Sequence, residues 1–153
     1  MMRFTGMGGL LIGGLLAVAG CGGGGGGGGD SSPSGSAVAS PFDAGPRAGE
    51  SLVDEALAAK GEPLFKSKTC STCHGFGVRI TGPDLKGVTQ RRSAAWMEQQ
   101  MLRPEVMTKE DPIARQLLGQ YAVQMPNLML KPDEVKALIE FLKKKDKETA
   151  AAQ

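Results

Sequence analysis

The residues that could do chemistry gather in one pentapeptide, Cys70-Ser71-Thr72-Cys73-His74. Two thiols separated by two residues lie about one helical turn apart, and an imidazole follows the second thiol directly. This spacing is the attachment signature of a c-type haem, whose vinyl groups form thioether bonds with both thiols. The imidazole is then placed to coordinate the iron through its unprotonated nitrogen. The motif therefore predicts a covalently bound haem c.

The numbers of cysteine and histidine residues restrict the metal chemistry. The chain has three cysteines, Cys21, Cys70 and Cys73, and His74 is its only histidine. A second haem attachment site is therefore excluded, and a structural zinc site would have no convincing fourth ligand. Because there is no second imidazole, methionine is the leading candidate for the opposite axial ligand. We expect one haem per chain.

Length and charge restrict the class of protein. The chain has 153 residues and a formal net charge of +2. This length suits one domain, and a charge so close to neutral gives no reason to expect a nucleic-acid partner. The domain has few aromatic residues to fill its core, and a buried porphyrin would supply apolar surface. We expect a monomer.

The N-terminal part predicts an export signal and a tether. Residues 1–20 carry one charge, at Arg3, before an apolar run that is too short for a comfortable membrane span. The run leads through alanine and glycine to Cys21, which resembles the lipobox of bacterial lipoproteins and implies a lipid on this cysteine. An ordinary secretory leader with a chance cysteine is the alternative. Residues 21–50 are rich in Gly, Ser and Pro and predict a disordered linker.

These features predict an exported protein that is lipid-anchored to a bacterial membrane. Its domain would lie in the periplasm or on the outer face. A flexible linker of this composition would let the domain meet membrane partners without being embedded.

The folded domain is expected over residues 51–147, followed by a tail at 148–153. Apolar spacing and capping residues predict two short helices before the haem motif, the second with Pro63 in its first turn. Further helices are expected after Ser93, ending at Pro104, after Asp111, and from about Pro132. No segment alternates as a strand would. The predicted fold class is all-α, a small helical domain around one haem.

Taken in order, the motifs resemble a monohaem class I cytochrome c over roughly residues 61–143. The resemblance is carried by Gly61 and Phe65, the haem motif, Gly82-Pro83-Asp84-Leu85, Met125-Pro126-Asn127-Leu128, and a last apolar helix with Phe141. Except for the haem motif, each part is weak alone, and their order makes the combination specific.

Carried over residue by residue, the resemblance implies thioether bonds from Cys70 and Cys73, proximal ligation by His74 and distal ligation by Met125. It also implies that the carbonyl of Pro83 accepts a hydrogen bond from the ligand histidine. Such a bond fixes the ring orientation and raises the basicity of the ligand.

The other methionines are weighed against Met125. Met129 stands where relatives often have glycine, and it is the second candidate for the distal ligand. Met97 and Met101 are expected in the core, because they recur at helical spacing. Met107 is expected in a loop, without a motif that supports a role as ligand.

Four further residues could reach the haem propionates. Arg91 and Arg92 follow the loop after the haem motif, and we interpret them as a solvated surface pair, with propionate binding as the alternative. Trp96 and Tyr121 could also hydrogen-bond to a propionate, but ordinary core packing is favoured for both.

Three functions are compatible with the motif. The leading hypothesis is one-electron transfer between redox partner proteins at a membrane surface, by a carrier that is not itself an enzyme. The second is a haem enzyme or gas sensor with an open distal site, which would need a polar pocket with an acid or base. The third is a thiol–disulfide redox protein using Cys70 and Cys73, and such motifs favour a βαβ setting.

Overall fold

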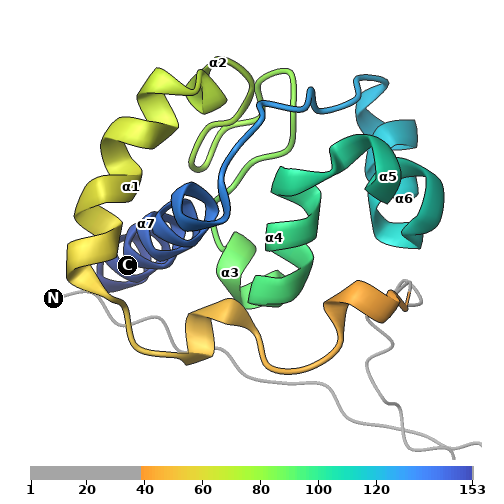
Figure 1. The fold of residues 1–153 in the computed structure, drawn as a ribbon. Helices are drawn as coiled ribbons and strands as arrows, with labels where there is room; N and C mark the ends of the chain where they lie inside the picture. Colours follow the sequence, from red (N-terminus) through yellow and green to blue (C-terminus); the bar gives the residue numbers. More distant parts are fainter. Residues whose placement is uncertain (1–38, 153) are drawn as a thin grey trace, which may run out of the picture. The chain divides into compact units, whose positions relative to one another are not determined.

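Helices make up almost all of the regular structure in residues 39–152, the part of the chain that the computed structural model describes (Figure 1). No strand occurs in this range, so the predicted all-α class is confirmed. The elements are η1 (Pro41–Asp43), η2 (Ala48–Glu50), α1 (Glu55–Ser67), α2 (Cys70–Cys73), α3 (Val88–Arg91), α4 (Ala94–Leu102), α5 (Pro104–Glu110), α6 (Pro112–Tyr121) and α7 (Pro132–Ala151). The predicted export signal, Cys21 and most of the predicted linker lie outside the described residues. None of the described helices is long and apolar enough to cross a membrane.

The first helix, α1, differs from the prediction of two short helices. It begins at Asp54, whose carboxylate accepts a hydrogen bond from the backbone N–H of Leu57 at 3.0 Å. It then continues through Pro63, which is exposed and costs the helix one backbone hydrogen bond. Packing of the buried face against α7 outweighs this loss, since proline is tolerated where its ring faces solvent and tertiary contacts hold both sides.

The crossing of α1 and α7 is close because Gly61 has no side chain. A Cβ at this position would lie 2.1 Å from the carbonyl oxygen of Ala137 and 2.7 Å from Cβ of Phe141. One turn further along α1, the ring of Phe65 packs against Phe141, with 5.4 Å between the ring centroids. The two helices therefore meet backbone to backbone, next to the segment that carries the haem motif.

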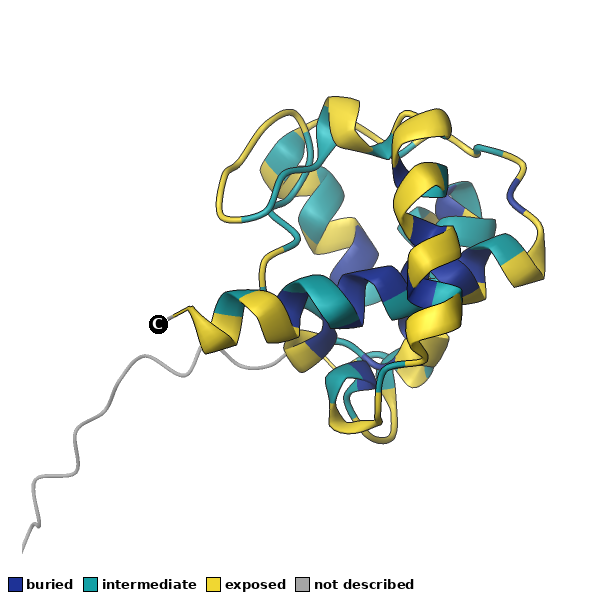
Figure 2. Cartoon of the chain, turned by 90° about the vertical axis from the view of Figure 1, so that its left-hand side faces the viewer, coloured by how far each residue is buried: buried dark blue, intermediate teal, exposed yellow. Residues whose placement is uncertain are grey.

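The last helix, α7, supplies the largest buried face of the domain (Figure 2). The sequence predicts a last apolar helix from about Pro132, and the structure contains it. Its buried stripe consists of Val135, Leu138, Ile139 and Leu142, which are each at most 6% exposed. The helix runs on to Ala151, beyond residue 147, where the sequence predicts the domain to end.

The middle of the domain holds helices that the patterns did not predict. Pro104 ends α4 as expected, but it also occupies the first position of α5, where its missing N–H costs little. Met107, expected in a loop, lies in α5 and is only 1% exposed. The short helix α3 was also not predicted, because four residues are too few to show an apolar period.

An N-terminal strap, residues 40–50, packs along the domain at the bottom of Figure 1, although the sequence predicts it as the end of the linker. The carboxylate of Asp43 accepts a hydrogen bond from the backbone N–H of Ser93 at 2.7 Å and pairs with Arg92 at 3.5 Å. Ala48 is 5% exposed and belongs to the core. Single contacts of this kind leave no periodic pattern in the sequence. The strap is therefore predicted as linker from its composition alone.

The close approach at Gly61 gives a prediction about stability. Gly61→Ala should lower the free energy of unfolding by about 1–3 kcal/mol, because the added methyl group overpacks the contact with α7. Gly119→Ala in α6 is the matched control, since nothing lies within 4 Å of its Cβ position. Alanine should stabilise that helix by up to about 1 kcal/mol. Denaturant titration of both variants tests this, and an equal effect at both positions would contradict it.

Candidate haem site

One turn of helix carries the two thiols of the motif. The chain leaves α1 through Thr69, whose φ of 58° reverses its direction, and then forms α2 from Cys70 to Cys73. The backbone N–H of His74 donates to the carbonyl of Cys70 at 3.0 Å, which closes the turn. The predicted helical turn between the cysteines is therefore present, and the two thiols are not joined in a disulfide.

The ring of His74 is held by the loop that follows it. Its Nδ1 lies 2.9 Å from the carbonyl oxygen of Pro83. Because a carbonyl only accepts, this contact requires a proton on Nδ1 and leaves Nε2 unprotonated. The backbone N–H of Gly82 also donates to the carbonyl of Cys73 at 2.8 Å, and a Cβ on this glycine would lie 2.8 Å from Cε1 of the ring. The loop thus fixes the tautomer and orientation that a metal-ligating imidazole needs.

An apolar cavity of about 170 Å³ opens beside the imidazole. Its walls include Cys70, His74 and Met125, and most of the remaining lining residues are aliphatic or aromatic. The lining residues come from all seven described α-helices and from the loops between them. Cys70 is the contribution of α2, and Thr108 is the contribution of α5. A thiol, an imidazole and a thioether around one apolar cavity form the donor set that fits a covalently bound haem.

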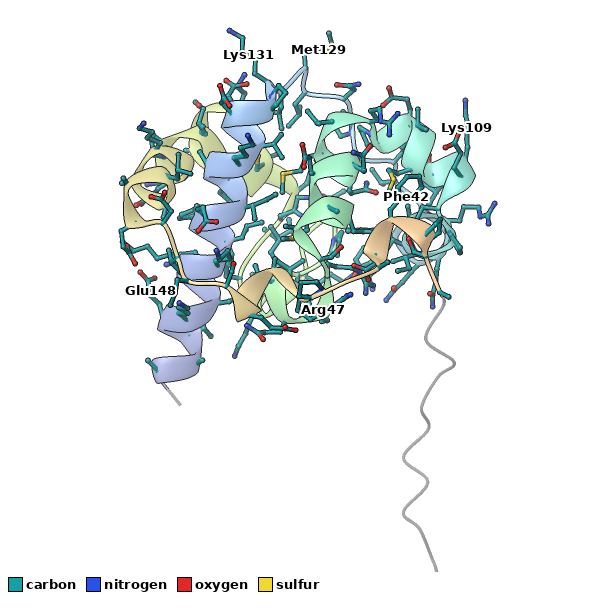
Figure 3. All side chains as sticks on the ribbon, turned by 60° about the horizontal axis from the view of Figure 1, so that its bottom comes forward. Phe42, Arg47, Lys109, Met129, Lys131 and Glu148 are labelled. Carbon is teal, nitrogen blue, oxygen red and sulfur yellow. The ribbon has the colours of Figure 1, made fainter. Side chains whose placement is uncertain are left out.

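The structure brings Met125 to the cavity and leaves Met129 outside it. Met125 is half-buried and lines the cavity. Met129 is 81% exposed, and its side chain points away from the domain (Figure 3). Its φ of 52° is in the left-handed region, which explains why a glycine would suit this position. Met97 and Met101, expected in the core, belong to it or pack against it and also face the cavity.

Arg91 and Arg92 are more firmly held than the solvated pair that we expected. Nη1 of Arg91 donates to the carbonyl of Lys86 at 2.6 Å. Arg92 pairs with Asp43 of the strap, and burial lowers the pKa of its guanidinium while the Asp43 carboxylate opposes that shift. Both arginines line the cavity. Their placement is compatible with the propionate contacts that the sequence left as the alternative.

The two aromatic residues of the prediction also border the cavity, and both have partners. The indole N–H of Trp96 donates to the buried carboxylate of Asp111 at 3.0 Å. The guanidinium of Arg79 lies over the ring of Tyr121, 4.3 Å from its centroid, and donates to the carbonyl of Gln120 at 3.3 Å. The packing role expected for Trp96 is supported by its 5% exposure.

Sequence reasoning did not single out Gln100. This residue lines the cavity one turn after Trp96, and its side-chain oxygen is buried without a hydrogen-bond partner. Its place on the cavity-facing side of α4 follows from helical spacing, but it is one of two adjacent glutamines, Gln99 and Gln100, and nothing in the pattern distinguishes them.

The thiol of Cys70 is unlike that of a thiol–disulfide enzyme. Burial raises its pKa above the ordinary value, with smaller opposing effects from the backbone and Lys68. A reactive thiol needs a lowered pKa, and no βαβ unit occurs in the described part of the chain. Both observations disfavour the thiol–disulfide hypothesis.

Comparison with known families decides the class of the domain. A family model described as "Cytochrome c" matches residues 58–146, more than half of the chain. The chain belongs to the cytochrome c family. Members of this family bind haem c covalently, so the cofactor predicted from the pentapeptide is supported by the whole domain.

Two curated relatives of this cytochrome c domain are named cytochrome c-551. The protein from Stutzerimonas stutzeri is 42% identical over 45 residues, and that from Ectopseudomonas mendocina is 46% identical over 35 residues. These matches cover 29% and 23% of this chain and 43% of each relative, so they span less than half of the relatives' length. A solved structure, a cytochrome c from Rhodothermus marinus, is 32% identical with a TM-score of 0.61, covering 67% of this chain and 96% of that one.

The contact between Gly82 and the imidazole gives a second prediction. Gly82→Ala should displace the His74 ring and weaken its hydrogen bond to Pro83, because the new methyl group would press on Cε1. The holoprotein should lose about 1–3 kcal/mol of stability. Its reduction potential should rise, since a less basic imidazole stabilises ferric iron less. Thermal unfolding and redox titration measure both effects. Unchanged values in both would show that the ring is not held in this way.

Proposed function

We propose that this cytochrome c carries single electrons between redox partner proteins, with His74 and Met125 as its axial ligands. The observation that carries the proposal is that an imidazole with its Nδ1 proton held by Pro83 and a thioether line the same apolar cavity. Cys70 lines that cavity as well, and Cys73 lies one turn away on α2. The protein acts as a donor or acceptor for redox enzymes and is not itself an enzyme.

The residues of the cavity suit a redox step with little rearrangement. The bound haem supplies the chemistry, because its iron can be ferric or ferrous with the same two axial ligands. The hydrogen bond to Pro83 would hold the His74 ring in one orientation when the haem is bound. The thioether of Met125 favours the ferrous state and raises the reduction potential relative to a second nitrogen ligand. The apolar walls offer water few hydrogen-bond partners.

A haem enzyme or gas sensor would need an acid or base beside an open iron site. Asp84 is the only carboxylate among the lining residues. Its Oδ1 already accepts hydrogen bonds from the backbone N–H groups of Gly77 and Lys86, at 2.7 and 2.8 Å. This carboxylate is therefore occupied in holding the loop, which favours the electron carrier over the enzyme.

Two methionine variants test the ligand assignment. Met125→Ala should abolish the weak far-red absorption band that arises from sulfur-to-iron charge transfer, and the ferrous variant should bind carbon monoxide rapidly. Met129→Ala is the matched control and should leave the band unchanged, because this side chain is exposed and does not line the cavity. Survival of the band in the first variant and its loss in the second would reverse the assignment. Rapid carbon monoxide binding by the unmodified ferrous protein would favour the open-site rival.

We further propose that the domain is exported and held at a bacterial membrane by a lipid on Cys21, through the Gly/Ser/Pro-rich linker. The apolar run of residues 1–20 and its single cationic residue support the export signal. A tether of this length would give a redox domain access to several membrane complexes.

Mass spectrometry of the mature N-terminus tests the anchor. The expected result is cleavage before Cys21 and a mass increase that corresponds to acyl groups on this residue. Cys21→Ser should release the domain from the membrane fraction while its haem absorption stays the same. A mature N-terminus without acyl groups, or a variant that stays in the membrane fraction, would contradict the anchor without affecting the haem site.

A further inference from the structure

One buried polar atom belongs to a residue that lines the apolar cavity. The side-chain oxygen of Gln100 is buried and has no hydrogen-bond partner, and no other buried side-chain atom in residues 39–152 is left in this way. Such groups are costly, because a buried amide that loses water without gaining a partner is destabilising. An unpaired amide in the wall of a cofactor cavity therefore points to a partner that belongs to the filled site.

Gln100 and Met125 line the same cavity, and side-chain hydrogen bonds connect the segment of Met125 to the helix of Gln100. The side chain of Asn127, two residues after Met125, donates to the carbonyl of Leu102 at 3.4 Å and to Oε1 of Glu105 at 3.0 Å. Leu102 is the last residue of α4, half a turn beyond Gln100. These bonds hold the segment between α6 and α7 against the C-terminal end of α4 (Figure 1). The segment that carries Met125 is therefore tied to the end of α4 that carries Gln100.

We propose that Gln100 donates a hydrogen bond from Nε2 to the sulfur of Met125. A half-turn of the terminal amide exchanges its oxygen and nitrogen, so the buried position can present an N–H donor. A thioether sulfur has two lone pairs; the iron takes one, and the other can accept a hydrogen bond. The inference rests on the proposed ligation by Met125, and it assigns Gln100 as the residue that positions and tunes this ligand.

The proposed bond has a defined electrostatic consequence. An N–H donor withdraws electron density from the sulfur and turns the positive end of the amide dipole toward the iron. Both effects disfavour the ferric state, which carries one more positive charge. Gln100 therefore raises the reduction potential, and its loss lowers it. The same loss raises the energy of the sulfur lone pair, so the sulfur-to-iron band moves to longer wavelength.

The test compares Gln100→Leu with Gln99→Leu in the haem-loaded protein. Gln99 is the matched control, because it neighbours Gln100 on α4, does not line the cavity, and already accepts a hydrogen bond from Nε of Arg103 at 2.9 Å. Gln100→Leu should raise the ferric-to-ferrous ratio at a fixed applied potential about tenfold, which corresponds to about 59 mV for one electron. Its far-red band should persist at longer wavelength. Gln99→Leu should change neither property.

The outcomes separate this inference from the proposed function. In one outcome, the far-red band persists in Gln100→Leu with the same wavelength and the same reduction potential as in Gln99→Leu. This result would leave the ligation by Met125 standing and overturn the role of Gln100. If Gln100→Leu shifts the potential but not the wavelength of the band, the amide binds a haem carboxylate instead of the Met125 sulfur. This result would also overturn the proposed bond. Absence of the band in the unmodified protein would overturn the ligation and the inference together. If Gln100→Leu does not accumulate as holoprotein, the smaller Gln100→Val gives the same comparison.

Discussion

The close crossing of α1 and α7 at Gly61 is the constraint on which the rest of the domain depends. With no Cβ at this position, the backbone of α1 meets the carbonyl of Ala137, and Phe65 can pack against Phe141. α1 then delivers the chain through Thr69 into the turn that carries both thiols. α7 provides the buried face against which α1, α3 and α4 pack. A bulkier residue at the crossing would move the attachment turn relative to α7.

Side chains from several helices surround the apolar cavity beside His74. The cavity therefore depends on how these helices are packed. Its polar groups are few and fixed. The carbonyl of Pro83 accepts a hydrogen bond from His74, and the carboxylates of Asp111 and Asp43 bind Trp96 and Arg92. The side-chain oxygen of Gln100 has no partner. The protein thus prepares the positions of the donor atoms in advance, which reduces rearrangement when the charge of the bound group changes.

Short spacings in the sequence predicted local contacts better than they predicted the boundaries of the elements. The attachment turn, the contact between His74 and Pro83, and the buried stripe of α7 all depend on short spacings or on a resemblance that preserves them, and the structure contains each one. The errors fell where tertiary contacts decide. Pro63 suggested a helix start, yet packing on α7 carries α1 through it.

Tertiary contacts also decide the position of the strap and the surroundings of Gln100, and the sequence patterns predicted neither. The strap has the composition of a linker, and only its anchors, such as the bond from Ser93 to Asp43, hold it to the domain. Gln100 shows its significance only when the cavity and its missing partner are known. Contacts between residues distant in sequence have no period that a pattern could reveal.

We propose that Cys70 and Cys73 hold one haem covalently in this cavity, with His74 as its ligand. The most direct measurement is the mass of the intact purified protein together with its pyridine haemochrome spectrum. The account predicts the added mass of one haem per chain and the spectrum of a haem whose two vinyl groups are saturated. A chain without this added mass, or a haem that acidified organic solvent extracts, would contradict it.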